Sequence, residues 1–282
     1  MLGTLYVVST PIGNLEDVTF RALRVLREAD LIAAEDTRHT ARLLQRYDIH
    51  TPTTSVHEHN ERQKLPALIA RLSAGEKIAV VSDAGTPGVR DPGYRLVRAA
   101  VEAGIPVEAV PGASAVLAAL VASGLPTDTF VFLGFPPVKG RARAEWFSTL
   151  SSEPRTAVFF EAPHRIRGTL ETLAGHVKDR EVVIGRELTK VHEEMLRGTA
   201  AALLERLGDP RGEMTVVVAG ASNDAEPEPP TDAVLWQTYR DMASATGMTR
   251  RDVISAVAAR YRLPLKTVYA AIERQKSLTD SR

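Results

Sequence analysis

Turn-forming and polar residues follow four apolar runs of the sequence, at points where strands are expected to end. Because ligands bind at the carboxyl ends of strands in parallel α/β sheets, these segments should gather along one rim of such a sheet. The sequence contains neither a dinucleotide-binding G-x-G-x-x-G after a strand nor a Walker G-x-x-x-x-G-K-[ST]. The segments therefore predict a ligand site of another kind: STPIGNLED (residues 9–17), AEDTRHT (34–40), SDAGTPGVRDPG (82–93) and VPGASA (110–115).

The third segment is unusual because it is acidic. Asp83 follows the apolar run directly, and Asp91 stands before the next expected helix. A phosphate cradle uses backbone amides and commonly a lysine, with no anion beside them. A carboxylate here instead suits ribose hydroxyls or a cationic ligand, and S-adenosylmethionine offers both. The structural alternative, glycine–proline turns with Asp91 as a helix N-cap, has equal weight on this segment alone.

The second segment places Glu35, Asp36, Arg38 and His39 at a strand end, where a substrate would enter. Acid–base residues at such a position are candidates for proton transfer. The alternative is structural: Asp36 or its neighbour caps the following helix, and Arg38 forms a surface salt bridge.

A metal site is not predicted. His57 and His59 would point the same way on a strand, but no third ligand follows at a suitable spacing. The HEE at residues 192–194 does not form an H-E-x-x-H motif, and the chain has no cysteine.

Short β-rich runs alternate with amphipathic helical patterns over the first 220 residues, which predicts an α/β protein with largely parallel sheets. Helical patterns between them include RALRVLREA and GYRLVRAAVEAG, and strand candidates include TLYVVS, DLIAAE, KIAVVS, PVEAVP, TFVFLG, RTAVFF, EVVIGRE and EMTVVVAG. We expect two α/β domains, residues 1–118 and 119–222.

A linker and a small helical module follow. The stretch ASNDAEPEPPTD has three prolines, four acids and no large apolar side chain, and we place the linker at residues 223–231. Residues 232–282 read as three short helices, of which the last two resemble a helix-turn-helix. From Thr231 onward there are nine Lys and Arg against five Asp and Glu, although the whole chain has no net charge. A basic tail of this kind indicates a polyanionic partner; the alternative is that the excess charge arises by chance and serves only solubility.

The bulk composition fits a soluble globular protein, with 44% hydrophobic and 25% charged residues in 282. The N-terminus lacks a basic region before its short apolar run, so it is expected to be a strand and not a signal peptide. No run approaches the length of a membrane span, and a cytoplasmic location is expected.

Several segments together resemble one family, the 16S ribosomal RNA 2'-O-ribose (cytidine) methyltransferases of the tetrapyrrole-methylase-like superfamily. The resemblance covers nearly the whole chain, and it lies in LYVVSTPIGNLEDVTFRAL, AEDTRHTARLL, HEHNE, VVSDAGTPGVRDPG, VPGASA, ASGLPTDTFVFLGF, FFEAPHRI, GRELTKVHEE and GEMTVVVAG. It implies S-adenosylmethionine in the cleft between two α/β domains, a homodimer, and 2'-O-methylation of a cytidine in the decoding region of the small ribosomal subunit.

The resemblance also implies site residues. Those carried over to the cofactor site are Pro11, Asp83, Gly85, Ser114, Ala115, Phe160, Glu161, Ala162, Leu188 and Thr215. Transfer to a ribose hydroxyl is an in-line displacement that depends on alignment, and a positioned base can add a factor of about 10²–10⁴. The sequence leaves the base open among Glu35, Asp36, His57, His59, Glu161 and Lys190, with Arg38 beside them; Lys190 would need a strongly lowered pKa.

Basic residues at three places are candidates for contacts with RNA phosphates, which give affinity without sequence information. They are Lys139, Arg141, Arg143, His164, Arg165, Arg250, Arg251 and Lys266; the alternative for the first group is a solvated loop face. Two other functions remain open: a superfamily methyltransferase acting on a tetrapyrrole or on a modified histidine of a translation factor, and a non-catalytic nucleic-acid-binding regulator.

Overall fold

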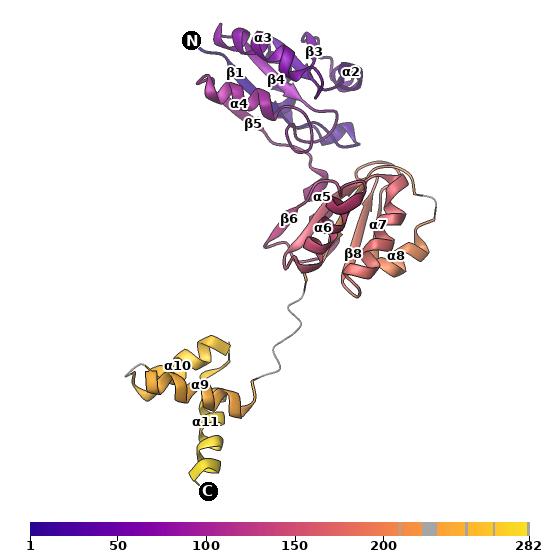
Figure 1. The fold of residues 1–282 in the computed structure, drawn as a ribbon. Coiled ribbons are helices and arrows are strands. Elements are labelled where there is room, and N and C mark those ends of the chain that lie inside the picture. The colour runs from indigo at the N-terminus through magenta and orange to yellow at the C-terminus, as the bar shows by residue number, and fades with distance from the viewer. Residues whose placement is uncertain (209, 222–229, 246–247, 262, 281–282) are drawn as a thin grey trace. The chain divides into compact units, whose positions relative to one another are not determined.

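A computed structural model of the chain describes residues 1–208, 210–221, 230–245, 248–261 and 263–280 (Figure 1). The chain divides into two compact units, Met1–Ala221 and Ser222–Arg282. No helix in the described ranges is both long enough and apolar enough to cross a membrane. The boundaries at residues 118/119 and 222/223 stay a prediction.

The first sheet has five parallel strands in the order β3-β2-β4-β1-β5. Its central strands β2 and β4 are buried on both faces, as their continuous apolar runs predict. Helices α1 and α2 pack on one apolar cluster and α3 and α4 on another. The elements are β1 (Thr4–Val8), α1 (Phe20–Glu28), β2 (Leu31–Ala34), α2 (Thr37–Arg46), β3 (Thr53–Ser55), α3 (Glu61–Ser73), β4 (Lys77–Val81), α4 (Tyr94–Glu102) and β5 (Val107–Val110).

The second sheet is mixed, and here the expectation of a largely parallel sheet is wrong. Only β6 and β7 pair in parallel; β7–β10, β10–β8 and β8–β9 are antiparallel, in the order β6-β7-β10-β8-β9. The elements are α5 (Ala115–Ser123), β6 (Phe130–Phe132), α6 (Gly140–Ser152), β7 (Thr156–Glu161), α7 (Pro163–His176), β8 (Glu181–Arg186), β9 (Glu194–Thr199), α8 (Ala200–Arg206) and β10 (Met214–Val218).

Helix α5 joins the two sheets. It begins a few residues after β5, the edge strand of the first sheet, and it packs on β7, β8, β9 and β10 of the second. Its buried Val116 and Leu120 share one apolar cluster with Ile12 and with Leu188. The strand-end loops of the first sheet are therefore held against the second sheet by a common core.

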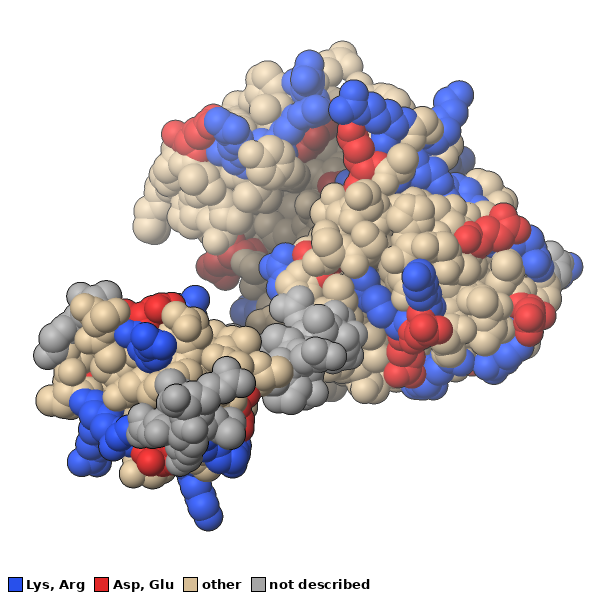
Figure 2. All heavy atoms as spheres, turned by 60° about the horizontal axis from the view of Figure 1, so that its bottom comes forward, with Lys and Arg blue, Asp and Glu red and all other residues tan. Residues whose placement is uncertain are grey.

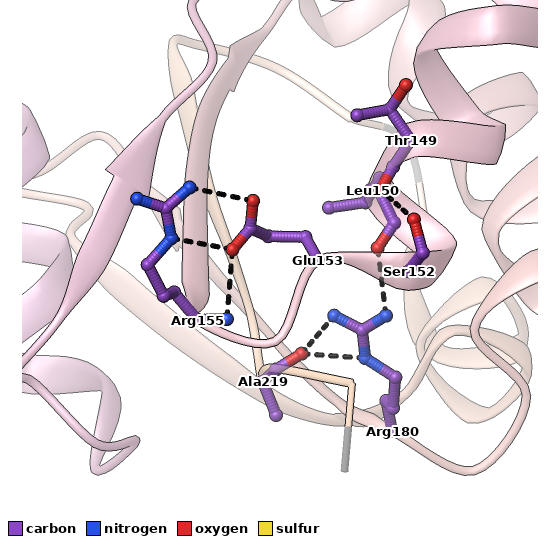
Figure 3. A network of polar contacts seen from close by, with 7 residues as sticks. All are labelled: Thr149, Leu150, Ser152, Glu153, Arg155, Arg180 and Ala219. Carbon is purple, nitrogen blue, oxygen red and sulfur yellow. Dashed lines mark hydrogen bonds and ion pairs between the residues drawn. The ribbon is translucent and has the colours of Figure 1, made fainter. Parts of the chain in front are cut away.

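The last residues of the first unit are held by a half-buried guanidinium, that of Arg180 (Figure 3). Arg180 donates hydrogen bonds to the carbonyl oxygens of Ala219 (2.7 Å from Nε) and Leu150 (3.0 Å), which joins the end of β10 to the end of α6. Glu153 pairs with Arg155 and accepts a hydrogen bond from Ala221 N at its carbonyl (2.7 Å). These bonds set the point at which the chain leaves the second sheet.

The second unit consists of α9 (Asp232–Ala245), α10 (Arg250–Tyr261) and α11 (Leu265–Asp280). Their apolar faces form a core of their own, which includes Leu235, Val257 and Val268. Three helices with their own core match the expectation from the sequence.

Candidate functional site

A cavity of about 430 Å³ lies at the ends of strands from both sheets. Its size is within the range of small-molecule sites, about 300–1,000 Å³. The residues that line it come mainly from the predicted segments and from the ends of β7 and β10: Ile12, Ala84, Gly85, Thr86, Val89, Arg90, Asp91, Ser114, Ala115, Val116, Phe135, Phe160, Glu161, Ala162, Pro163, Leu188, Glu213, Met214 and Thr215.

The first and third predicted segments are hydrogen-bonded to each other. Thr10 and Gly85 exchange backbone hydrogen bonds of 2.8 and 3.1 Å, and the Ser9 and Thr86 hydroxyls are 2.8 Å apart. Gly85 has a φ of 74°, which favours glycine because other residues adopt it at a cost. The two loops therefore form one continuous wall, in which Gly85 lines the cavity.

Asp91 does not cap the next helix, so the structural alternative for it is not what is observed. The N-cap of α4 is Gly93, and the buried carboxylate of Glu61 accepts hydrogen bonds from the amides of Gly93 and Leu96, both at 3.3 Å. Asp91 is left to line the cavity.

Asp91 belongs to a cluster of three acidic side chains. Asp36 N donates to Asp83 Oδ1 (3.0 Å), and Asp83 N donates to Glu35 Oε2 (3.3 Å). Burial raises the pKa of Glu35, and the charge of Asp83 adds to it. Burial also raises the pKa of Asp91 to about 6, to which the charges of Glu35 and Asp83 contribute. No ion pair within the described ranges reaches Glu35, Asp83 or Asp91, so a positive ligand group would be favoured here.

We expect Asp91→Asn to stabilise the ligand-free protein by about 1 kcal/mol at pH 8, after solvent screening is allowed for. The pKa of Asp91 is higher in the folded chain than its ordinary 3.8, so the native state binds more protons and loses stability as pH rises from 3.8 to about 6. The gain should therefore vanish near pH 4. Denaturant unfolding at both pH values measures it, with exposed Asp128→Asn as the control; a gain that persists at pH 4 would contradict the assignment.

Two phenylalanines form an apolar wall of the cavity. The ring of Phe160 is 5.5 Å from that of Phe135, and the Arg90 guanidinium lies 5.8 Å over Phe135. Arg90 reaches this position across Gly134, where a Cβ atom would be 2.5 Å from Arg90 Nε. The contact ties the loop of the first sheet to the end of β6.

Most residues assigned to the cofactor site by resemblance line this cavity: Gly85, Ser114, Ala115, Phe160, Glu161, Ala162, Leu188 and Thr215. Pro11 and Asp83 do not; they line a second cavity of about 410 Å³ that shares Ile12, Ala84 and Glu213 with the first. The sequence reasoning missed Phe135 and Met214, although both lie within recognised segments, and it left Asp91 unassigned although its acidity had been noticed.

The second cavity is the more polar of the two in its side chains. Hydroxyl, carboxylate and basic groups reach it, among them Thr10, His39, Arg42, Ser82, Asp83 and Lys190. Lys190 comes close to Gly13, where a Cβ atom would be 2.6 Å from Lys190 Cγ. Its ammonium group donates to Glu187 (2.9 Å) and Glu213 (3.2 Å). Partial burial lowers the pKa of Lys190, but the two carboxylates outweigh this and raise it, so Lys190 is held protonated and is unsuited to act as a base.

Three further catalytic candidates have structural partners. Asp36 caps α2 by accepting from Arg38 N (2.8 Å), and it pairs with the Arg38 side chain, which lowers the pKa of Asp36. Glu161 lines the cavity, but its side chain is fully buried and accepts from Thr169 Oγ1 (2.6 Å) and from its own neighbour's amide. This matches the structural alternative for Asp36 and Arg38.

His57 and His59, the other two candidates for the base, line neither cavity. His57 Nε2 is 2.9 Å from Asn60 Nδ2, and the rings of His57 and His59 are in edge contact at 6.0 Å. The described residues contain no group of three side chains arranged to hold a metal ion.

The predicted RNA contacts of the second sheet divide into two groups. Arg143 donates to Pro137 O and Thr169 Oγ1, and Arg165 donates to Pro136 O and pairs with Glu161 at 3.2 Å. Arg165 therefore supports the cavity wall through Glu161, and both arginines already have internal partners. Phosphate binding by these two residues stays a prediction. Lys139, Arg141 and His164 are exposed, with Arg141 paired to Glu145.

The chain matches known proteins over most of its length. Residues 4–204 match the model of the tetrapyrrole (corrin/porphyrin) methylases. Proteins named ribosomal RNA small subunit methyltransferase I are 45% identical over 271 residues in Synechocystis sp. (95% of this chain, 96% of the relative) and 50% identical over 222 residues in Micromonospora olivasterospora (78% and 71%).

Solved structures share the fold. Diphthine synthase aligns with a TM-score of 0.61 at 17% identity, covering 77% of this chain and 89% of its own. The methyltransferase CobJ aligns with a TM-score of 0.60 at 22% identity (78% and 95%). The predicted fold class is thereby confirmed. On the match to the family model and on the level of identity, this chain belongs to the tetrapyrrole (corrin/porphyrin) methylase family, with the ribosomal RNA small subunit methyltransferases I as its relatives.

Proposed function

We propose that the protein transfers a methyl group from S-adenosylmethionine to the ribose 2'-hydroxyl of a cytidine in 16S ribosomal RNA, in the decoding region of the small subunit. The observation that carries this proposal is the 430 Å³ cavity at the ends of both sheets, with Asp91 in its wall, which no cation of the described residues pairs with, and a polar cavity beside it. The relatives named ribosomal RNA small subunit methyltransferase I support the substrate class.

The residues of the first cavity fit S-adenosylmethionine. Phe135 and Phe160 offer apolar surface for a purine, and Gly85, which has no side chain, lines the cavity between the two sheets. Asp91 would face positive charge, which relieves the cost that its own burial imposes. When bound, the cofactor supplies a methyl group already activated by its sulfonium. The residues that would hold it are Gly85, Asp91, Ser114, Ala115, Phe160, Ala162, Leu188 and Thr215.

The second cavity is where we place the acceptor nucleotide. Asp83 offers a carboxylate to the ribose hydroxyls, and Arg42 and His39 stand at its wall without ion pairs in the described ranges, available to a phosphate. The backbone amide of Asp36 fixes one oxygen of Asp83, so the carboxylate is oriented before the substrate arrives. Ile12 and Ala84 line both cavities, so the methyl group in one and the acceptor hydroxyl in the other would meet at these residues. In this scheme most of the rate enhancement comes from aligning the hydroxyl with the methyl group.

The hydroxyl proton must leave during or after the transfer. Glu35 and Asp83 are hydrogen-bonded through the backbone, and the raised pKa of Glu35 makes it a better proton acceptor than an exposed carboxylate. Of the two, only Asp83 lines the cavity of the acceptor, so we assign proton removal to Asp83, with Glu35 behind it, and not to Lys190, whose pKa is raised.

We also propose that the enzyme acts as a homodimer in the cytoplasm, where small subunits are assembled. Helix α5 supports a dimer, because two of its large apolar side chains, Leu117 and Val121, are 52% and 73% exposed. A second copy of the chain could cover them. Sedimentation equilibrium of wild type and Val121→Glu would test this face.

The test of the activity uses the full-length protein with methyl-labelled S-adenosylmethionine. Small subunits and naked 16S RNA that lack the modification are offered separately, and the RNA is digested to nucleosides. Label in 2'-O-methylcytidine is the expected result. Label confined to a base, or transfer only to a porphyrinoid, would overturn the proposal.

A further inference from the structure

The C-terminal unit carries a recess between the first turns of two helices. Its volume is about 620 Å³, and it is lined by Arg250, Arg251, Ile254 and Ser255 of α10 and by Leu265, Lys266 and Tyr269 of α11. The three basic residues singled out in the sequence of this unit therefore meet at one place. Figure 2 shows Lys and Arg side chains projecting from this unit, which has more positive than negative charge.

An aromatic ring within the recess lies against an arginine side chain. Tyr269 is 51% exposed, and the Arg250 guanidinium lies 5.5 Å from the centre of its ring. Arg250 is in turn paired with Glu273, one turn further along α11. The ion pair thus positions a cation on the ring, and Arg250 supports the ring instead of standing free for a phosphate.

The remaining basic residues of the recess are free to bind a ligand. Arg251 and Lys266 are both exposed, and neither forms an ion pair within the described ranges. They flank Tyr269 from two different helices. Leu265, 55% exposed, adds apolar surface beside the ring, and the exposed Ser255 adds a hydroxyl.

We propose that this recess binds an unpaired nucleotide of an RNA strand, with the base stacked on Tyr269 and the adjoining phosphates at Arg251 and Lys266. Base stacking on an aromatic ring with basic groups beside it is the chemistry of single-strand recognition. A base inside a duplex cannot reach a ring within a recess, whereas an unstacked base can. The choice of RNA over DNA rests on the proposed function.

The test measures binding of the full-length protein to a fluorescein-labelled oligocytidylate by anisotropy. Tyr269→Ala should weaken binding about tenfold, within the range for loss of one stacked base, whereas Tyr269→Phe keeps the ring and should bind like wild type. Arg251→Ala and Lys266→Ala should each reduce the slope of log affinity against log salt by about 0.7. Arg240→Ala, which removes an exposed charge of α9 outside the recess, is the matched control and should lower affinity less.

The outcomes separate this inference from the proposed function. Equal affinity of Tyr269→Ala and wild type, or a preference for duplex RNA, would overturn the recess as a nucleotide site. An effect of Tyr269→Ala on subunit binding but not on naked RNA would show that the recess contacts a ribosomal protein and would also overturn it. If Tyr269 is required for RNA binding but no methyl group is transferred, the inference stands and the proposed function fails. Circular dichroism of each variant shows whether the helices are retained.

Discussion

Tryptophan in place of Ala115 is expected to lower methyl transfer by at least about 100-fold, with no loss of RNA binding by the C-terminal unit. Ala115 is the first residue of α5 and lines the 430 Å³ cavity, so an indole there would occupy space that we assign to the cofactor. Isothermal titration with S-adenosylmethionine measures the loss of binding, and label incorporation measures the loss of activity.

The control for this variant is Ala122→Trp. Ala122 lies on the same helix, is exposed and lines neither cavity. Ala122→Trp introduces the same side chain and should keep cofactor affinity within about twofold of wild type, as expected for a surface substitution. Normal cofactor affinity in Ala115→Trp would remove the cavity as the cofactor site.

Alanine at Glu161 is expected to destabilise the first unit by about 3–5 kcal/mol, because it leaves the largely buried Arg165 without its partner. The hydroxyl of Thr169, which is fully buried, loses its acceptor in the same change. In a unit of this size the loss corresponds to a fall in Tm of about 10 °C. Differential scanning calorimetry measures it.

Glu145→Ala provides the comparison. Glu145 pairs with Arg141 one turn away on α6, but both side chains are mostly exposed, so its loss should cost no more than about 0.5 kcal/mol. Glu161→Gln keeps a carbonyl oxygen for Thr169 and should be intermediate. If Glu161→Ala cost no more than Glu145→Ala, the supporting role of Glu161 would be wrong, and a direct catalytic role would need to be reconsidered.

The sequence predicts the strand-end segments of the first sheet well, because their apolar runs, glycines and prolines are local signals. It misses β9, whose EMLRGT is polar and lies at the edge of the second sheet. It also misses strand direction: the runs in β8 and β10 show buried strands, but direction depends on connections such as β9 and α8 that carry weak patterns.

Side-chain direction limits the prediction of the site. Asp83 stands in the recognised loop, yet its carboxylate turns to the amide of Asp36 and the second cavity. Arg143 and Arg165 look like free surface cations in sequence, but their long side chains turn inward to the carbonyls of Pro137 and Pro136. Such contacts join residues far apart in the chain, and no local pattern reveals them.

Gly13 and Gly134 lie where side chains from one sheet reach the other, and this affects how mutations act on the site. At Gly13 and at Gly134 the chain carries only hydrogen where Lys190 and Arg90 cross from the opposite side. At Gly134 a side chain would displace the Arg90 guanidinium from Phe135 and strain a backbone whose φ is 69°, and at Gly13 it would meet Lys190, Thr189 and the carbonyl oxygen of Leu188. Two positions that carry no functional group therefore decide whether Lys190 and Arg90 can reach the opposite sheet, and a substitution there would act on the site without touching a ligand.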